Sequence, residues 1–279
     1  MENDDISLII QSLLLIFAVS WTAWGLMWFF ELAPGAGLLS TGLWLIGGSG
    51  PTIGAALFIG KKGGVSSVKD LFKTLARWRV PIKWYLAVLG IPILISSIAI
   101  AIGMALNWTA FDELDFSQSW LLLPLLIINS IFTGGVSEEV GWRGYILPKL
   151  QRNLSAFTAS ILLGGIWAGW HLPLFLIPGT TQVDWPLSWF LAMGFALSIL
   201  FTWVYNSTEG SVLLIALFHG SVNTFISAVW LFLGTIDPNF ARIISGSFIT
   251  VSILVLVVNG AKTLSNSTRW TEPFFDRTL

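Results

Sequence analysis

The sequence has no cysteine and few charged residues. Without cysteine, the 279-residue chain can form no disulfide, thiolate nucleophile or cysteine-ligated metal site. Asp, Glu, Lys and Arg make up 10% of it, whereas an ordinary soluble domain carries about 25%. Hydrophobic residues make up 55%, and the mean hydropathy is +0.80. So few charges exclude a water-soluble globular fold, and a net charge of −1 gives no basic surface for nucleic acid.

Long uncharged runs dominate the chain instead. Eight stretches without Asp, Glu, Lys or Arg each contain at least 19 residues, and a membrane-spanning helix needs about 20 apolar residues. We therefore expect an all-α polytopic membrane protein, a single membrane domain over 1–279 with about eight transmembrane helices. The runs are 6–30, 32–60, 84–111, 116–137, 153–183, 185–208, 210–236 and 243–261.

The basic residues predict the orientation. With eight spans, 13 of the 14 basic residues fall on one side of the membrane, seven of them in 61–83. Since Lys and Arg collect in cytoplasmic loops, we expect both termini in the cytoplasm and an integral multi-pass protein of a prokaryotic plasma membrane. In 61–83, Val68, Leu71, Phe72 and Leu75 share one helical face. This pattern predicts a basic amphipathic helix in the cytoplasmic interface, and a helical basic loop is the alternative.

At three places in the sequence, polar residues lie in or next to the expected membrane spans, where inserting an ionisable side chain costs free energy. Near the end of the fourth run, Glu139 and Arg143 have the i, i+4 spacing of an ion pair, whereas Glu138 points about 100° away. The two histidines of the chain, His171 and His219, lie in the fifth and seventh runs, and Asn223 follows His219 by one turn. Solvated glutamates at the membrane boundary and histidines that bond neighbouring helices are the structural alternatives.

Together these groups suit hydrolysis of a peptide bond. Glu138 with His171 could activate a water molecule, and His219 with Asn223 could donate to a developing oxyanion. A Zn²⁺ site made by Glu138, His171 and His219 also fits the chemistry of the ligands. These residues alone do not decide between water activated by a metal and water activated by a glutamate.

At these motifs the chain resembles the CPBP family of intramembrane proteases, which includes the type II CAAX prenyl endopeptidases (Rce1-like) and the bacterial Abi and lysostaphin-resistance-like proteins. The family pattern is Glu-Glu-x-x-x-Arg, then Phe-x-x-x-His, then His-x-x-x-Asn. The chain matches it over about 120–225, with Trp167 in place of the phenylalanine. The matching residues are Glu138, Glu139, Arg143, His171, His219 and Asn223.

The resemblance implies an intramembrane endopeptidase of the glutamic type, with no cofactor and with its site in a membrane cavity open to the cytoplasm. It implies that Glu138 and His171 activate water and that His219 and Asn223 stabilise the oxyanion. Glu139 and Arg143 support them. The implied partners are membrane lipids and a peptide or lipidated protein substrate, and not nucleic acid.

Two other functions fit the same polar groups. A transporter or channel would arrange them along a proton or ion path, and a non-enzymatic immunity or scaffold protein would keep them for structure. A protease instead requires Glu138 and His171 within about 10 Å of each other, so that one water can bridge them. We therefore predict that the helix of the fourth run continues through Arg143. Trp167 is bulkier than phenylalanine and is expected to narrow the site or its entrance.

Overall fold

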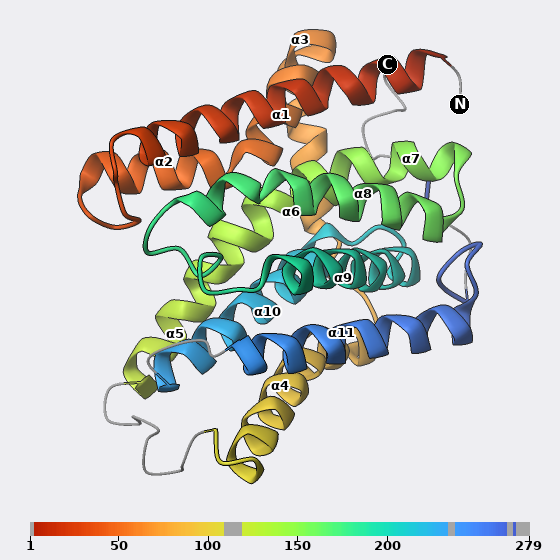
Figure 1. Ribbon diagram of the computed structural model, residues 1–279. Coiled ribbons are helices and arrows are strands. Elements are labelled where there is room, and N and C mark those ends of the chain that lie inside the picture. The colour runs from red at the N-terminus through yellow and green to blue at the C-terminus, as the bar shows by residue number, and fades with distance from the viewer. Residues whose placement is uncertain (1–2, 109–118, 234–237, 267–269, 272–279) are drawn as a thin grey trace.

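The computed structural model describes residues 3–108, 119–233, 238–266 and 270–271. These residues form helices and turns, with no strand among them, which confirms the all-α class. Figure 1 shows the helices packed into one bundle. They are α1 (Asn3–Phe29), α2 (Leu38–Gly48), α3 (Gly50–Lys73), α4 (Ile82–Ala105), α5 (Ser119–Ser130), α6 (Ser137–Gly141), α7 (Leu147–Asn153), α8 (Ala156–Trp170), α9 (Leu187–Ser207), α10 (Val212–Leu233) and α11 (Pro238–Asn259).

Within the described ranges, six helices are long and apolar enough to cross a membrane. A seventh span results if α2 and α3, which are bent by 62° relative to each other, are counted together. The expected count of eight is not confirmed, because the predicted run 116–137 begins outside the described residues and its helix is divided into shorter segments. The six spans are Ile6–Phe29, Ile82–Ala105, Ala156–Leu176, Leu187–Ser207, Val212–Val229 and Pro238–Asn259.

The helices α5, α6 and α7 form one uninterrupted helical run. Two π-helical segments, Ile131–Val136 and Trp142–Ile146, join them from Ser119 to Asn153. π-Helical turns inside α-helices occur frequently at functional sites, since they change which side chains face a neighbour. The prediction that the helix continues through Arg143 is confirmed.

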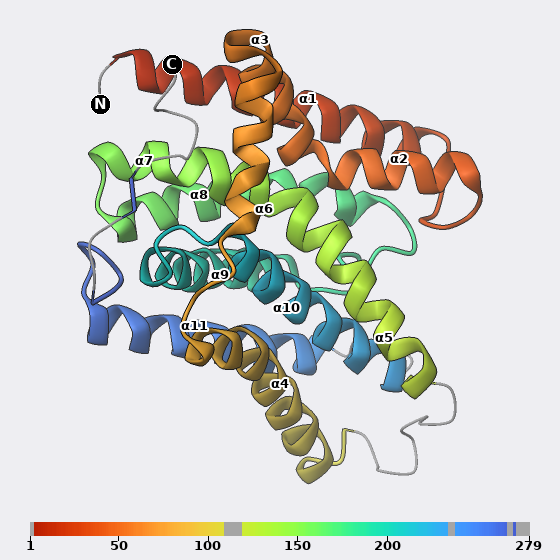
Figure 2. The same cartoon turned by 180° about the vertical axis from the view of Figure 1, so that it is seen from behind.

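Glycines let this helical run approach its neighbours closely. A Cβ atom on Gly141 would lie 2.2 Å from the carbonyl oxygen of Pro51 on α3. A Cβ atom on Gly135 would lie 2.2 Å from the carbonyl oxygen of Ala216 on α10. Because neither backbone oxygen can move aside cheaply, glycine at these two positions lets the helical run lie directly against α10 at Gly135 and against α3 at Gly141; Figure 2 shows these helices from behind.

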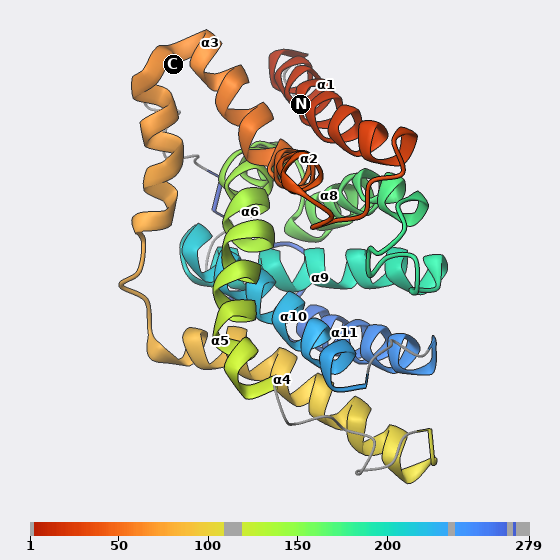
Figure 3. The same cartoon turned by 90° about the vertical axis from the view of Figure 1, so that its left-hand side faces the viewer.

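The chain turns back on itself within α3. Gly64 has φ 71° and ψ −168°, and Figure 3 shows the second half of the helix folding back there. Beyond this break, Leu71 is fully buried, whereas Phe72 remains 41% exposed. The predicted segment 61–83 is thus helical through Lys73, and part of its apolar face packs against the protein. Its position in the cytoplasmic interface stays a prediction.

Several helix ends meet at one face, which we call the basic face. The backbone N–H of Ala156 at the start of α8 donates to the carbonyl oxygen of Lys262, just after α11. Arg77, beyond α3, forms an ion pair of 3.2 Å with Glu209, just after α9. The opposite face therefore contains the other ends of α8 and α9 and the connection between them, 171–186.

Candidate active site

Glu139 and Arg143 form the ion pair that their spacing predicts. The guanidinium Nη1 of Arg143 donates to both carboxylate oxygens of Glu139, at 3.0 and 2.9 Å, and both side chains have no exposed surface. Nη2 reaches the hydroxyl of Ser198 on α9 at 3.4 Å. A buried charge is tolerated only when it is paired and hydrogen-bonded, so this pair fixes the position of Glu139.

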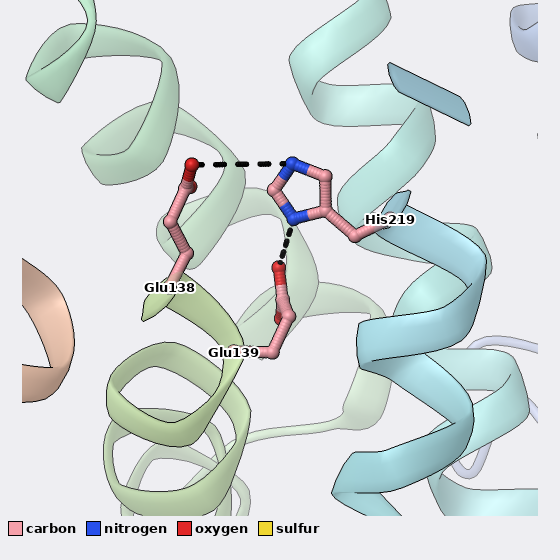
Figure 4. A group of neighbouring side chains, drawn as sticks. All are labelled: Glu138, Glu139 and His219. Carbon is pink, nitrogen blue, oxygen red and sulfur yellow. Dashed lines mark hydrogen bonds and ion pairs between the residues drawn. The ribbon is translucent and has the colours of Figure 1, made fainter. Parts of the chain in front are cut away.

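His219 lies between the two glutamates. Its Nδ1 is 2.7 Å from Oε1 of Glu139, and its Nε2 is 4.0 Å from Oε1 of Glu138. Figure 4 shows the imidazole of α10 placed between the two carboxylates of α6. Since Glu139 is the carboxylate bound to Arg143, it accepts from the Nδ1–H of His219. The other ring nitrogen therefore faces Glu138 and the cavity.

Glu138 has a hydrogen-bond donor that the sequence analysis did not anticipate. The indole Nε1–H of Trp167 on α8 donates to Oε2 of Glu138 at 2.7 Å, and Trp167 is only 4% exposed. We expected Trp167 to matter by its bulk. The signal for its polar role was present in the sequence, because tryptophan has an N–H donor that phenylalanine lacks.

His171 directly follows the last residue of α8 and is tied to the same tryptophan. Its Nδ1 lies 2.8 Å from the carbonyl oxygen of Trp167. Because a carbonyl only accepts, Nδ1 carries the proton and Nε2 is left as an acceptor. Within the described chain no hydrogen bond or ion pair joins His171 directly to Glu138; Trp167 contacts both, through its carbonyl and its indole.

One cavity of about 320 Å³ is lined by all four predicted catalytic residues, Glu138, His171, His219 and Asn223, together with Trp167. A glycine makes room for the amide of Asn223. A Cβ atom on Gly134 would lie 2.4 Å from Nδ2 of Asn223 and 3.3 Å from Nε2 of His219. The groups on three separate helical segments thus converge on a single space.

A metal ion would find a different set of ligands from the predicted one. Glu138, Glu139 and His219 offer ligand atoms within 4.8 Å of one another, so Glu139 stands where the sequence-based alternative had His171. Both oxygens of Glu139 are already bonded to Arg143, and Oε1 also accepts from His219. A metal at this cluster would have to share Glu139 with Arg143, which makes these residues a poor fit to a Zn²⁺ centre.

The fold and the site together define a polytopic all-α membrane protein with a buried cluster of glutamate, arginine and histidine side chains beside a cavity. Residues 118–225, a span that contains every predicted site residue, match the family model of the type II CAAX prenyl endopeptidases, Rce1-like. A CAAX prenyl protease 2 of Methanococcus maripaludis is 29% identical over 188 residues, which cover 62% of this chain and 67% of that protein. Both comparisons support the CPBP, Rce1-like family that the motifs indicate and, with it, an intramembrane endopeptidase.

Proposed function

We propose that this protein hydrolyses a peptide bond within the membrane with a water molecule activated by Glu138, without a metal ion. The observation that supports this most directly is the different bonding of the two glutamates. Glu139 accepts three hydrogen bonds, from Arg143 and His219, whereas Glu138 accepts one indole N–H and faces the cavity. A carboxylate held in place but not saturated is able to accept a proton from water.

The proposed attack uses Glu138 and His171 on either side of the water. The free lone pairs of Glu138 and the Nε2 lone pair of His171 both accept hydrogen bonds from it. As the water oxygen bonds to the carbonyl carbon of the substrate, its proton passes to Glu138. Collapse of the tetrahedral intermediate then breaks the C–N bond, and Glu138 returns the proton to the leaving nitrogen, so that the products are an acid and an amine.

The oxyanion is proposed to bind between Asn223 and His219, which are neighbours on one face of α10. The side-chain amide of Asn223 donates directly, and His219 donates from Nε2 when both ring nitrogens carry protons. In that form the two glutamates, Arg143 and His219 have a combined charge of zero. A neutral group of paired charges is less costly to bury than one with a net charge. Glu139 and Arg143 are therefore positioning residues.

The relative from Methanococcus carries the name CAAX prenyl protease 2. For this chain we propose a broader class of substrate, namely a membrane-associated peptide or a lipidated protein. We propose no nucleic-acid partner. The cavity supports this class, because aromatic side chains line it beyond the catalytic groups: Trp24, Trp44, Trp170, Trp185 and Phe190. Such a surface favours apolar side chains or a lipid next to the scissile bond.

The test is cleavage of a fluorogenic lipopeptide library by the purified protein in detergent. Wild type and Glu138→Gln are each measured with and without a chelator. We expect Glu138→Gln to abolish cleavage and the chelator to leave the wild type unchanged. Glu209→Gln is the matched control, since Glu209 is exposed and outside the cavity. Loss of activity with the chelator would replace the glutamic mechanism by a metal-dependent one. Proton or ion flux through proteoliposomes without cleavage would favour a transporter.

A further inference from the structure

The helical run from α5 to α7 shares two contacts of the same spacing with α9. Nη2 of Arg143 reaches the hydroxyl of Ser198 at 3.4 Å, and the side-chain amides of Gln151 and Asn206 exchange hydrogen bonds of 3.0 and 2.7 Å. Both pairs are 55 residues apart in the sequence, so the second contact lies equally far beyond the first on both helices. The Gln151–Asn206 pair thus fixes the same register that places Arg143 beside Ser198.

A π-helical segment, Trp142–Ile146, lies between these two contacts. A π turn closes its hydrogen bonds from i to i+5 and therefore holds more residues than an α turn. If this segment changed to α, the helix beyond it would rotate relative to Glu139 and Arg143. The pair of Gln151 and Asn206 opposes such a rotation, because both amides are buried and a lost bond would leave a buried polar group unpaired.

The segment after α11, described for residues 260–266 and 270–271, bonds to this amide pair, and we call it the strap. The backbone N–H of Trp270 donates to Oδ1 of Asn206 at 3.2 Å, and its carbonyl oxygen accepts from Nε2 of Gln151 at 3.0 Å. The carbonyl oxygen of Thr263 accepts from Nδ2 of Asn206 at 2.8 Å. Every side-chain N–H of the two amides therefore has an acceptor, in the other amide or in the strap.

The indole of Trp270 anchors the strap between two connections of the basic face. The guanidinium carbon of Arg77, beyond α3, lies 4.6 Å from the centroid of the ring. Gly210, just after α9, has φ 85°, and a Cβ atom there would lie 2.4 Å from Nε1 of the indole. Glycine at this position leaves the space that the ring occupies, so the ring holds the backbone of Trp270 beside the amide pair.

The strap also contacts the start of α8. The carbonyl oxygens of Ala261 and Lys262 accept from the backbone N–H groups of Phe157 and Ala156, at 3.0 Å each. These N–H groups have no partner within their own helix, so the strap supplies it. In Figure 1, α7 and the ends of α9 and α11 lie together at the right of the bundle. The strap thus connects α7, α8 and α9, and α8 carries Trp167.

We propose that the strap is a clasp for the candidate active site: docking of Trp270 on the Gln151–Asn206 pair holds the helical run in register with α9 and thereby keeps Glu139 and Arg143 in place. Trp270, Gln151 and Asn206 are positioning residues, because they lie outside the cavity lining and act through the helices. The effect of the clasp on cleavage rests on the proposed function, whereas its effect on the helical run does not.

Hydrogen–deuterium exchange of the full chain in detergent tests the clasp without a substrate. Trp270→Ala removes the anchoring ring. Trp78→Ala is the matched control, since it removes an indole that is 58% exposed and packs on Arg79 instead. We expect peptides from 137–146 to exchange about ten-fold faster in Trp270→Ala, equivalent to about 1.4 kcal/mol or one hydrogen bond, and at the wild-type rate in Trp78→Ala.

Cleavage kinetics of the same preparations test the consequence for the site. We expect Trp270→Ala to lower kcat by about ten-fold with KM unchanged, because small displacements of catalytic groups cost rate while the cavity lining stays intact. Trp270→Phe keeps a ring beside Arg77 and the same backbone groups, so it should restore most of the protection and most of kcat. Arg77→Gln, a milder change, should shift both quantities in the direction of Trp270→Ala.

Three results would overturn the clasp. Faster exchange confined to 147–153 and the strap would mean that Trp270 stabilises only the helix ends. Equal effects of Trp270→Ala and Trp78→Ala would indicate a general loss of stability. Faster exchange over 137–146 with an unchanged kcat would separate the strap from the site. A wild type that cleaves nothing, with faster exchange over 137–146 in Trp270→Ala, would retain the clasp and refute the proposed protease activity.

Discussion

Replacement of Trp167 by phenylalanine tests the role of its indole N–H. The variant Trp167→Phe keeps an aromatic ring at this buried position but removes the donor that is 2.7 Å from Oε2 of Glu138. Without that donor, the carboxylate can rotate away from the position in which it faces the cavity. We therefore expect a lower kcat, with KM little changed, because the replaced group contacts Glu138 and not the substrate.

The expected fall in kcat follows from the strength of the hydrogen bond between Trp167 and Glu138. A hydrogen bond to a charged group contributes about 1.5–3 kcal/mol, and each 1.36 kcal/mol corresponds to a factor of ten, so kcat should fall by roughly 10- to 150-fold. The assay is the initial rate of cleavage of the best fluorogenic lipopeptide over a range of concentrations in detergent. Thermal unfolding of the same preparation reports whether the variant remains folded.

Trp142→Phe is the matched control. Trp142 has 0% exposure, and its indole N–H has no hydrogen-bond partner in the part of the chain that the structure describes. Both variants therefore lose the same volume from the interior, but only Trp167→Phe loses a bond. An equal effect of the two substitutions on kcat would refute the reasoning. Higher activity of Trp167→Phe would show instead that the bulk of the indole restricts the site.

Three further variants test other parts of the site. Gly134→Ala places a methyl group 2.4 Å from the amide nitrogen of Asn223, so kcat should fall while Gly169→Ala, with nothing within 4 Å, leaves it unchanged. Asn223→Ala should lower kcat by about 10²–10³-fold, as expected for loss of an oxyanion donor; a smaller effect on kcat than on KM would assign Asn223 to substrate binding. Arg143→Met leaves a buried carboxylate unpaired and should lower the free energy of unfolding by about 3–5 kcal/mol, with partial recovery on adding Glu139→Leu; unchanged thermal stability would contradict this role.

Composition and motif spacing predicted the parts of the structure that depend on residues close together in the sequence. The uncharged runs became helices because the membrane requires every backbone group to bond within its own segment. The pairing of Glu139 with Arg143 follows from one helical turn. His219 and Asn223 share a face of α10 for the same reason, and both line the cavity as expected.

The parts that were missed depend on how separate helices approach one another. The hydrogen bond from Trp167 to Glu138 links residues 29 positions apart and exists only because the fold brings the indole of α8 within reach of α6. The close contact of Gly135 with the backbone of Ala216, which places Glu139 against His219, has no signature in the spacing of either residue. The two π-helical segments, one in the fourth run and one just beyond it, also escaped prediction, since apolar composition alone does not distinguish α from π turns.

The indole of Trp167 contacts an anion and a cation with different parts of one ring system. An aromatic ring carries partial positive charge at its edge and partial negative charge on its faces. The edge N–H of Trp167 meets Glu138, while the guanidinium carbon of Arg143 lies 5.0 Å from the ring centroid over its face. Each contact orients the ring for the other. The Glu138 carboxylate, which we propose as the proton acceptor, is therefore aligned against the buried ion pair through a single rigid, uncharged side chain.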